Sequence, residues 1–192
     1  MMAALACGRS KTGGFSACEL NILNGTDSIM RVLTIQDSID LAVLRAVSCD
    51  FSAKELMSEQ FTKLGHRMVA TVTHPSQDGV GIAGPQVGLN RRIVAVQRFD
   101  KTGEPFEVYA NVRIVWLSDS LAYGPEGCLS VPDRRGNVLR SQQIVIEYAD
   151  LASLSHSCDD IPMARDTVSG FTAVIFQHEI DHLEGVLYID RL

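Results

Sequence analysis

The sequence predicts an α+β fold in which short, mainly antiparallel strands surround a C-terminal helix, and three patterns support this class. Apolar residues recur at helical spacing through residues 52–73, and they alternate with polar residues in short segments between 92 and 148. The last element, residues 171–183, is apolar in its first half and polar in its second. We therefore expect one domain over residues 30–192, preceded by a flexible N-terminal tail over residues 1–29.

The composition excludes several classes of function. The chain of 192 residues has 17 Lys+Arg against 23 Asp+Glu, a net charge of −6, and its basic residues form no block. Nucleic acids and anionic membranes are bound by a concentrated positive surface, so we expect no direct nucleic-acid binding. No apolar run approaches the roughly 20 residues that cross a bilayer, so no membrane span is expected.

Residues 1–29 mix small residues with Gly, Ser and Asn without a sustained period, which is typical of a tail. The stretches MMAALAC and FSAC each resemble a lipoprotein cleavage site, but neither follows the basic stretch and apolar segment of a leader. A lipoprotein-like leader is therefore kept only as an alternative. Regular structure is expected to begin near Met30, where the stretch RVLTI is rich in β-branched residues.

A helix is expected over residues 52–73. Ser52 and Glu55 form a capping box at its start, and His74-Pro75 ends it. His66 lies off the apolar stripe and is expected to face solvent. The stripe that should face the core consists of Met57, Phe61, Leu64, Met68 and Val72.

Strands are expected where apolar and polar residues alternate downstream of this helix. The four segments are Arg92–Gln97, Phe106–Tyr109, Val112–Leu117 and Ile144–Tyr148. Turns are expected at Asp100–Gly103 and Tyr123–Glu126. Residues 150–169 are polar and irregular, which indicates an exposed excursion. His156 and Cys158 lie within it, and a mobile loop is the preferred interpretation over a metal site because ligands need rigid support.

The C-terminal helix, Phe171 to Leu183 with Gly185 after it, contains the sequence His-Glu-Ile-Asp-His. His178 and His182 are four residues apart and share one helix face, so both imidazoles can bind one metal ion. Glu179 is rotated by about 100° and can stand beside the metal, where a carboxylate can move protons. A structural hydrogen-bond cluster is the alternative for the two imidazoles.

A catalytic metal site needs a third protein ligand. Only Glu184 and Asp190 follow the helix as candidates, so we expect the ligand upstream. Cys128 is the best candidate because the surrounding residues 124–132, GPEGCLSVP, form a tight turn with little room for side chains. Asp181 can be either a partner of the metal ligands or a surface charge.

The glycine-rich stretch GVGIAGPQVG at residues 79–88 could be a nucleotide loop, but it lacks the third glycine of the dinucleotide fingerprint and contains Pro85. Small residues at these positions instead let the backbone pass close to a metal and to an extended substrate. We therefore expect this segment to line the site.

Three motifs together resemble the peptide deformylases: Gly79–Gln86, Glu126–Ser130 and Gln177–His182. The resemblance runs from about Met30 to Leu192 and implies a peptide deformylase-like fold. It implies that Cys128, His178 and His182 bind one divalent metal ion, Fe(II) in the family's native form, with Zn, Ni or Co able to substitute.

The implied reaction removes the N-formyl group from the initiator formyl-methionine of new polypeptides and releases formate. Metal-activated water would attack the formyl carbon, with Glu179 as general acid and base. The resemblance assigns the oxyanion donors to the Gln86 amide and the Leu129 N–H, and substrate contacts to Gly81 and Arg135. The partners would be nascent formyl-methionyl peptides near the ribosome, in a bacterial-type cytoplasm.

The sequence departs from the family pattern at several places. Gly84 stands where the family usually has alanine, which could loosen the loop or widen the methionine pocket, and Asn111-Val112 replaces a common Asn-Pro. The excursion at 150–169 is longer than usual. Two other functions stay open: a peptidase of the HExxH type, disfavoured by the missing downstream ligand, and a binding protein that has lost turnover.

Overall fold

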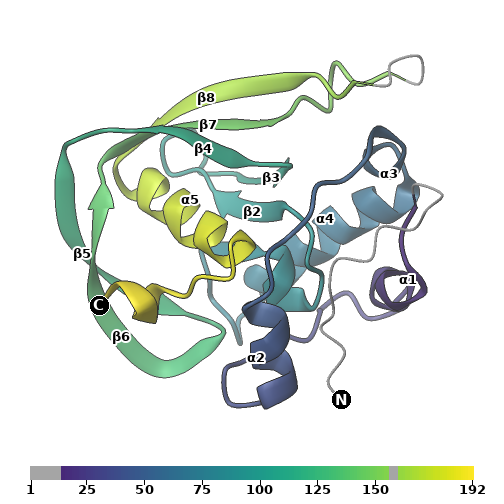
Figure 1. Cartoon of the computed structure of the whole chain (residues 1–192), viewed down its shortest axis with the longest axis horizontal. Helices are drawn as coiled ribbons and strands as arrows, with labels where there is room; N and C mark the ends of the chain where they lie inside the picture. The colour runs from purple at the N-terminus through teal and green to yellow at the C-terminus, as the bar shows by residue number, and fades with distance from the viewer. Residues whose placement is uncertain (1–13, 156–159) are drawn as a thin grey trace.

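The computed structural model describes residues 14–155 and 160–192, and it confirms the α+β class (Figure 1). Among these residues no helix combines the length and the apolar content needed to cross a membrane. The helices are α1 (Ala17–Leu23), α2 (Ser38–Leu44), α3 (Ala53–Leu56), α4 (Glu59–Val72) and α5 (Gly170–Leu183), with short 3-10 helices η1 (Gly84–Val87) and η2 (Tyr188–Arg191). The strands are β1 (Gly81–Ala83), β2 (Ile93–Gln97), β3 (Phe106–Ala110), β4 (Arg113–Leu117), β5 (Leu121–Cys128), β6 (Val131–Ser141), β7 (Gln143–Ala149) and β8 (Met163–Ser169).

The described strands form three sheets in which every named pair is antiparallel, as expected. Their orders are β1-β2-β3, β4-β7-β8 and the two-stranded ribbon β5-β6. In Figure 1 helix α5 runs between these sheets, with the β5-β6 ribbon curving along its left side and beneath it. The helix that carries the predicted ligands is therefore held from several sides.

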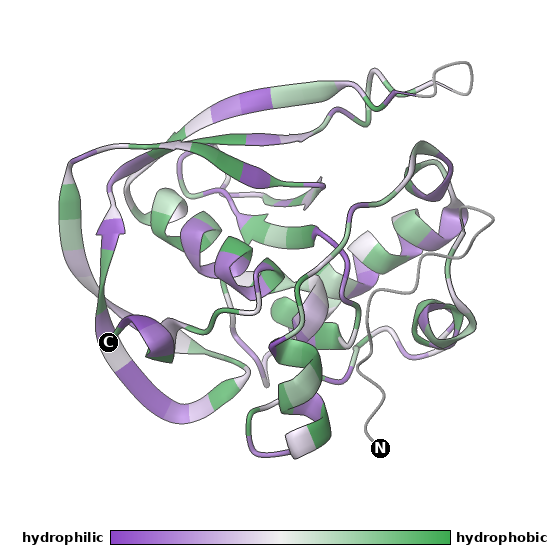
Figure 2. Ribbon diagram, in the orientation of Figure 1, coloured by the Kyte–Doolittle hydropathy of each residue, from purple (hydrophilic) through white to green (hydrophobic). Residues whose placement is uncertain are grey.

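Strand β2 is buried on both faces and positions the two long helices. Ile93 and Ala95 belong to the core cluster that contains the apolar face of α4, whereas Val94 and Val96 belong to the cluster that contains α5. Successive side chains of a strand point to opposite faces, so one short strand serves both clusters. The green colour of β2 in Figure 2 reflects this continuous apolar run.

The helix expected over 52–73 is broken into α3 and α4. The Ser52–Glu55 capping box is present, with the Ser52 N–H donating to the Glu55 carboxylate at 2.7 Å. The chain then leaves the helix at Met57, and the Ser58 hydroxyl caps a new helix by accepting from the Phe61 N–H at 3.2 Å. His66 is exposed, as expected. The buried members of the predicted stripe are Phe61, Leu64, Met68 and Val72.

Two segments expected to be turns or irregular chain form strands. Residues 123–126 lie within β5, which pairs with β6 along its length, and residues 163–169 of the expected excursion form β8, which pairs with β7. Pro125 cannot donate a ladder hydrogen bond, and a two-stranded ribbon tolerates this because each strand has a free edge. Strand β8 is polar and largely exposed, so alternation does not reveal it. His156 and Cys158 lie outside the described residues.

The end of the expected tail is ordered in the structure. Helix α1 begins with a capping box between Ser16 and Glu19, and its last residue, Leu23, is fully buried. Glu19 also pairs with the buried guanidinium of Arg91 at 2.5 Å. Within residues 14–29, helix α1 therefore packs on the domain, while residues 1–13 of the expected tail lie outside the described part of the chain.

Candidate functional site

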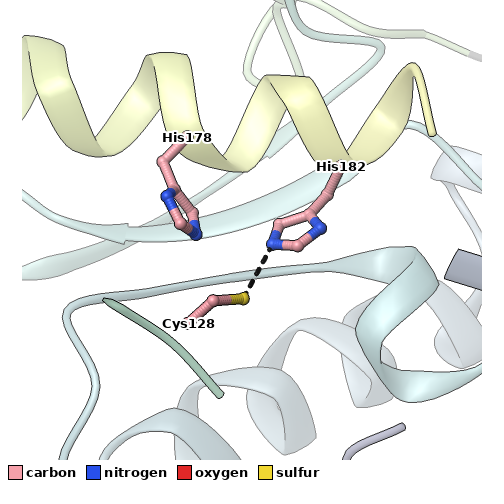
Figure 3. Close-up of side chains that lie close together, drawn as sticks. All are labelled: Cys128, His178 and His182. Carbon is pink, nitrogen blue, oxygen red and sulfur yellow. Dashed lines mark hydrogen bonds between the residues drawn. The ribbon is translucent and has the colours of Figure 1, made fainter. Parts of the chain in front are cut away.

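Helix α5 directs both histidines of its motif toward the end of strand β5. Figure 3 shows His178 and His182 projecting from one face of the helix toward Cys128. Nε2 of His182 lies 3.2 Å from the Cys128 sulfur, and the three potential ligand atoms all lie within 4.8 Å of one another. The structure thus brings together the three residues predicted as ligands.

Cys128 is placed by a tight turn, as its neighbours predicted. It is the last residue of β5, and Leu129 and Ser130 form the turn into β6. Burial raises the pKa of the Cys128 thiol, but the two imidazoles outweigh this and hold that pKa well below its ordinary value. The sulfur therefore favours the thiolate form, which is the form that binds metals.

Glu126 fixes the orientation of His178. Its carboxylate accepts a hydrogen bond from Nδ1 of His178 at 2.8 Å, which leaves Nε2 of that ring for the Cys128 side. Burial raises the pKa of Glu126, but His178 and Arg140 lower it to about 2. Burial would lower the pKa of His178, yet Cys128 and Glu126 raise it to about 10. Opposite charges on Glu126, His178 and Cys128 thus stabilise one another.

A chain of buried charges continues behind Glu126. Arg140 donates to Glu126 at 2.8 Å and to Asp181 at 2.6 Å, and Arg191 from η2 donates to the other side of Asp181 at 2.6 Å. Asp181 is 9% exposed. The open choice for Asp181 is thereby decided: it supports the ligands through Arg140 and Glu126 and is not a free surface charge.

Gln177 ties the ligand helix to strand β6. Its side-chain amide donates to the Ser141 carbonyl at 2.8 Å and accepts from the Ser141 N–H at 3.1 Å. Together with the Arg140 contacts, this fixes α5 against the strand that follows the Cys128 turn. The distance between the histidines and the cysteine is therefore set by buried hydrogen bonds on two elements.

Glu179 is buried beside the cluster with one oxygen free. It is 4% exposed, and its Oε2 atom has no hydrogen-bond partner among the described residues. Burial raises the pKa of Glu179 to about 7, although the two imidazoles act in the opposite direction. Gly81 faces this carboxylate so closely that a Cβ atom there would lie 2.5 Å from Oε1. Such a group can accept or release a proton near neutral pH.

Gln86 reaches the cluster from η1. Its side-chain oxygen accepts from the Ala83 N–H at 2.8 Å, so the amide nitrogen is turned toward the site. That nitrogen lies 3.2 Å from the Ser130 hydroxyl and 3.5 Å from the Cys128 sulfur. A fixed N–H donor therefore stands next to the place where the three ligand atoms converge.

A cavity of about 790 Å³ opens onto this cluster. Gly81, Gln86, Leu129 and Glu179 line it, and so does the exposed Arg135. Its apolar wall comes from Leu129, Phe171, Val174 and Ile175. The structure therefore places every residue singled out for catalysis or substrate contact at one cavity, with His182 buried beneath it.

Gly84 does not belong to this cavity wall. A Cβ atom at Gly84 would lie 2.7 Å from the carbonyl oxygens of Leu89 and Arg91. The glycine therefore allows close backbone packing behind η1, and the expectation that it widens the methionine pocket finds no support in its position.

Sequence reasoning gave no role to Arg140, Ser130 or the apolar wall on α5. Glu126 begins the motif Glu126–Ser130, two residues before Cys128. This position is the signal that could have identified Glu126 as a support of the site. Arg140 has no such signal, because only the pairing of β5 with β6 brings it to Glu126. The two acidic residues downstream of the helix are engaged elsewhere: Glu184 pairs with Arg92, and Asp190 with Arg45.

The donor set fits a metal ion. One thiolate and two imidazoles are ligands that zinc, iron, cobalt and nickel accept. The hydrogen bond from His178 to Glu126 is the arrangement that orients a ligating histidine. A metal ion held by three protein ligands would keep coordination positions for water or substrate, as a catalytic site needs.

Comparison with known proteins agrees with this site. Residues 29–192 match the family model described as polypeptide deformylase. The peptide deformylase of Leptospira biflexa is 39% identical over 157 residues, which cover 78% of this chain and 82% of that protein. A crystal structure of the class I type b peptide deformylase from Acinetobacter baumannii superposes with a TM-score of 0.73 at 33% identity, covering 85% of this chain and 99% of that one. A second structure of that enzyme, with Met-Ala-Ser bound, gives a TM-score of 0.70 at 32% identity, covering 85% of this chain and 98% of the other.

The family model spans the domain from just before Met30 to the C-terminus and includes all three motifs. The fold, the Cys/His/His cluster and the similarity to relatives thus lead to one conclusion: the chain belongs to the polypeptide deformylase family, whose members are metal-dependent.

Proposed function

We propose that this chain removes the N-formyl group from the initiator formyl-methionine of newly made polypeptides and releases formate. One observation carries the proposal: Glu179, with a free carboxylate oxygen, lies beside the Cys128/His178/His182 cluster at a cavity. A proton carrier beside a set of metal-binding side chains at a cavity suits hydrolysis of a small terminal group.

The three clustered residues would hold one divalent metal ion, Fe(II) in the native protein, with Zn, Ni or Co as substitutes. When bound, such an ion supplies a Lewis acid that lowers the pKa of water enough for hydroxide to be available near neutral pH. The protein's own contribution is the fixed ligand geometry, which Glu126 and Arg140 support from behind.

Glu179 would accept the proton of the attacking water and pass it to the leaving amine. Its burial and the raised pKa of about 7 suit both steps, because the carboxylate then binds and releases a proton near neutral pH. Gly81 supports this role, because a side chain at this position would clash with the Glu179 carboxylate and force it to move.

Two N–H groups would stabilise the oxyanion of the tetrahedral intermediate: the side-chain amide of Gln86 and the backbone N–H of Leu129. Both residues line the cavity, and the hydrogen bond from the Ala83 N–H to the Gln86 side-chain oxygen orients the amide before substrate arrives. Donors held in advance need no reorganisation during the reaction.

The substrate would enter with its methionine side chain against the apolar wall formed by Leu129, Val174 and Ile175. We propose that the peptide backbone passes Gly81 and that Arg135, exposed at the cavity, contacts its outer end. The relative with Met-Ala-Ser bound supports a peptide ligand of this kind. The partners would be nascent chains near the ribosome in a bacterial-type cytoplasm, without direct nucleic-acid contact.

Two observations disfavour a peptidase of the HExxH type. The acidic residues that could act as a downstream ligand, Glu184 and Asp190, are paired with arginines. The third donor of the cluster is instead the upstream thiol of Cys128.

A substrate panel tests the proposal. The iron-loaded protein, prepared without oxygen, is given formyl-methionyl, acetyl-methionyl and formyl-aspartyl versions of one peptide. We expect turnover of the formyl-methionyl peptide, at least about tenfold slower turnover of the formyl-aspartyl peptide because its charge meets an apolar wall, and none of the acetyl peptide. Cleavage within the peptide in place of deformylation would contradict the proposal.

A further inference from the structure

The segment Leu33–Ile35 connects the two loops that carry the proposed oxyanion donors. The Leu33 N–H donates to the Gln86 carbonyl at 2.8 Å, and the Ile35 N–H donates to the Ser130 carbonyl at 2.9 Å. We call this segment the bridge. Only Thr34 separates the two donor residues, so this short segment couples the two carbonyls that it binds. The bridge therefore sets the separation of the two loops.

No other backbone hydrogen bond among the described residues joins Gln86 to the turn at 129–130. The direct link between the loops is the side-chain contact of Gln86 with Ser130, at 3.2 Å. A side-chain contact moves with the residue that makes it, so it cannot by itself fix where the donor stands. The position of the Gln86 backbone relative to Leu129 depends on the bridge.

Asp40 holds the bridge from outside the cavity. One of its carboxylate oxygens accepts from the Thr34 N–H, the middle residue of the bridge, at 3.1 Å. The same carboxylate is 5% exposed and accepts two hydrogen bonds from Arg31, at 2.9 and 2.7 Å. Because the Arg31 side chain is 67% exposed, the part-buried contact with the Thr34 backbone is the one that fixes the bridge.

Helix α2, which carries Asp40, is anchored at its other end as well. The Asn90 side chain, just beyond η1, donates to the carbonyls of Val43 and Ala46 at 2.8 and 3.3 Å. The helix is thus tied both to the bridge and to the loop that follows Gln86. These two anchors make α2 a rigid support for that donor.

We propose that Asp40 is a positioning residue for the reaction, acting through the bridge on the two oxyanion donors. The inference rests on the proposed function, because it takes Gln86 and Leu129 as those donors. Asp40 touches neither the cavity nor the metal ligands, so its removal should change the transition state and leave metal binding and substrate binding intact. Its effect belongs in kcat and not in KM.

The test compares Asp40→Ala with Asp40→Asn and with Asp37→Ala in the metal-loaded full chain. The Asp37 side chain caps α2 by accepting from the Ile39 N–H at 2.7 Å and from the Asp40 N–H at 3.1 Å. Asp37 reaches the bridge only through its backbone N–H, which donates to the Thr34 carbonyl at 3.4 Å and is kept in the alanine variant, so this variant controls for the loss of the helix cap. We expect Asp40→Ala to lower kcat for a formyl-methionyl peptide about tenfold or more, with KM and bound metal unchanged. Asp40→Asn keeps an acceptor for Thr34 and should stay within about threefold of wild type, as should Asp37→Ala.

Amide hydrogen exchange supplies a readout that does not depend on turnover. The Leu33 and Ile35 amides should exchange slowly in wild type and faster in Asp40→Ala, but not in Asp37→Ala. Equal kcat in the two alanine variants, or fast exchange of both amides in wild type, would overturn the inference. The wild-type exchange result decides the matter even when Asp40→Ala does not fold. Failure of wild type to release formate would instead overturn the proposed function.

Discussion

The carboxylate of Glu126 lies 2.8 Å from Nδ1 of His178, and the same carboxylate is held by Arg140. This contact decides which nitrogen of His178 is available to a metal. The metal site therefore depends on more than its three candidate ligands, because Glu126 sets the orientation and the protonation state of His178.

Replacing Glu126 by alanine should weaken metal binding without removing a ligand. We expect the metal affinity to fall by about 10–100-fold, because His178 loses the acceptor that orients it. A titration against a competing chelator measures the metal affinity. Glu126→Gln retains an acceptor for His178, so its metal affinity should lie between those of wild type and Glu126→Ala. The control is Glu147→Gln, which removes the half-buried carboxylate that pairs with the exposed Arg165 on the β7-β8 ladder. An unchanged affinity in Glu126→Ala would contradict the orienting role.

Gly81→Ala should reduce activity through Glu179. The new Cβ would approach Oε1 of Glu179 to 2.5 Å and a methyl of Ile175 to 2.9 Å, so the carboxylate must move. We expect kcat to fall by about 100-fold while bound metal is retained. Gly124→Ala is the matched control, because a Cβ there meets nothing within 4 Å. Equal kinetics for the two variants would show that the approach of Gly81 to Glu179 does not matter.

Glu179 and Cys128 should separate catalysis from metal binding. Glu179→Gln should keep the metal and lose at least about 100-fold in kcat, since the proton carrier is gone. Its folding stability should not fall, because a neutral amide replaces a carboxylate whose ionised form burial disfavours. Cys128→Ala should lose metal. Metal analysis of both purified proteins checks the division, and equal metal loss would contradict it.

The stability of the fold should decline in acid through the cluster around Arg98. The guanidinium of Arg98, 2% exposed, pairs with Asp100 and Asp166 and holds the pKa of Asp100 below its ordinary value of 3.8. A lowered folded-state pKa contributes stability that is present above that ordinary value and is lost as the pH falls through the folded-state value. Urea unfolding between about pH 5 and pH 2 should therefore show a smaller acid loss in Asp100→Asn than in wild type. Identical losses would exclude this contribution.

Local patterns were enough to predict the ligand helix. In α5 the spacing of His178 and His182, the apolar first half and Gly185 are all local features, and Gly185 has the positive φ of 71° expected beyond a helix end. The break in the predicted 52–73 helix was missed because Ser58 competes as a cap with the apolar stripe that continues across it. The spacing of apolar residues predicts which face of a helix is buried, but it does not indicate where a helix is briefly interrupted.

The support of the site could not be predicted, because it depends on pairing between distant segments. Arg140 reaches Glu126 only when β5 and β6 form a ribbon, and the glycines and Pro125 in β5 conceal that strand. The bridge at 33–35 makes two backbone hydrogen bonds to separate loops and is not part of a helix or a strand. Neither the helical nor the alternating pattern of apolar residues can therefore reveal it. Helix α1 is too short for a sustained period, and tertiary burial of Leu23 holds it.

The most direct test of the central claim is a paired count of products from one formyl-methionyl peptide. The protein is prepared without oxygen and loaded with iron, and formate and new free methionyl amino termini are measured in the same reaction. We predict that the two appear in equal amounts, that the rest of the peptide stays intact, and that Glu179→Gln forms neither. Release of internal fragments, or the absence of formate from a protein that carries its metal, would contradict the account.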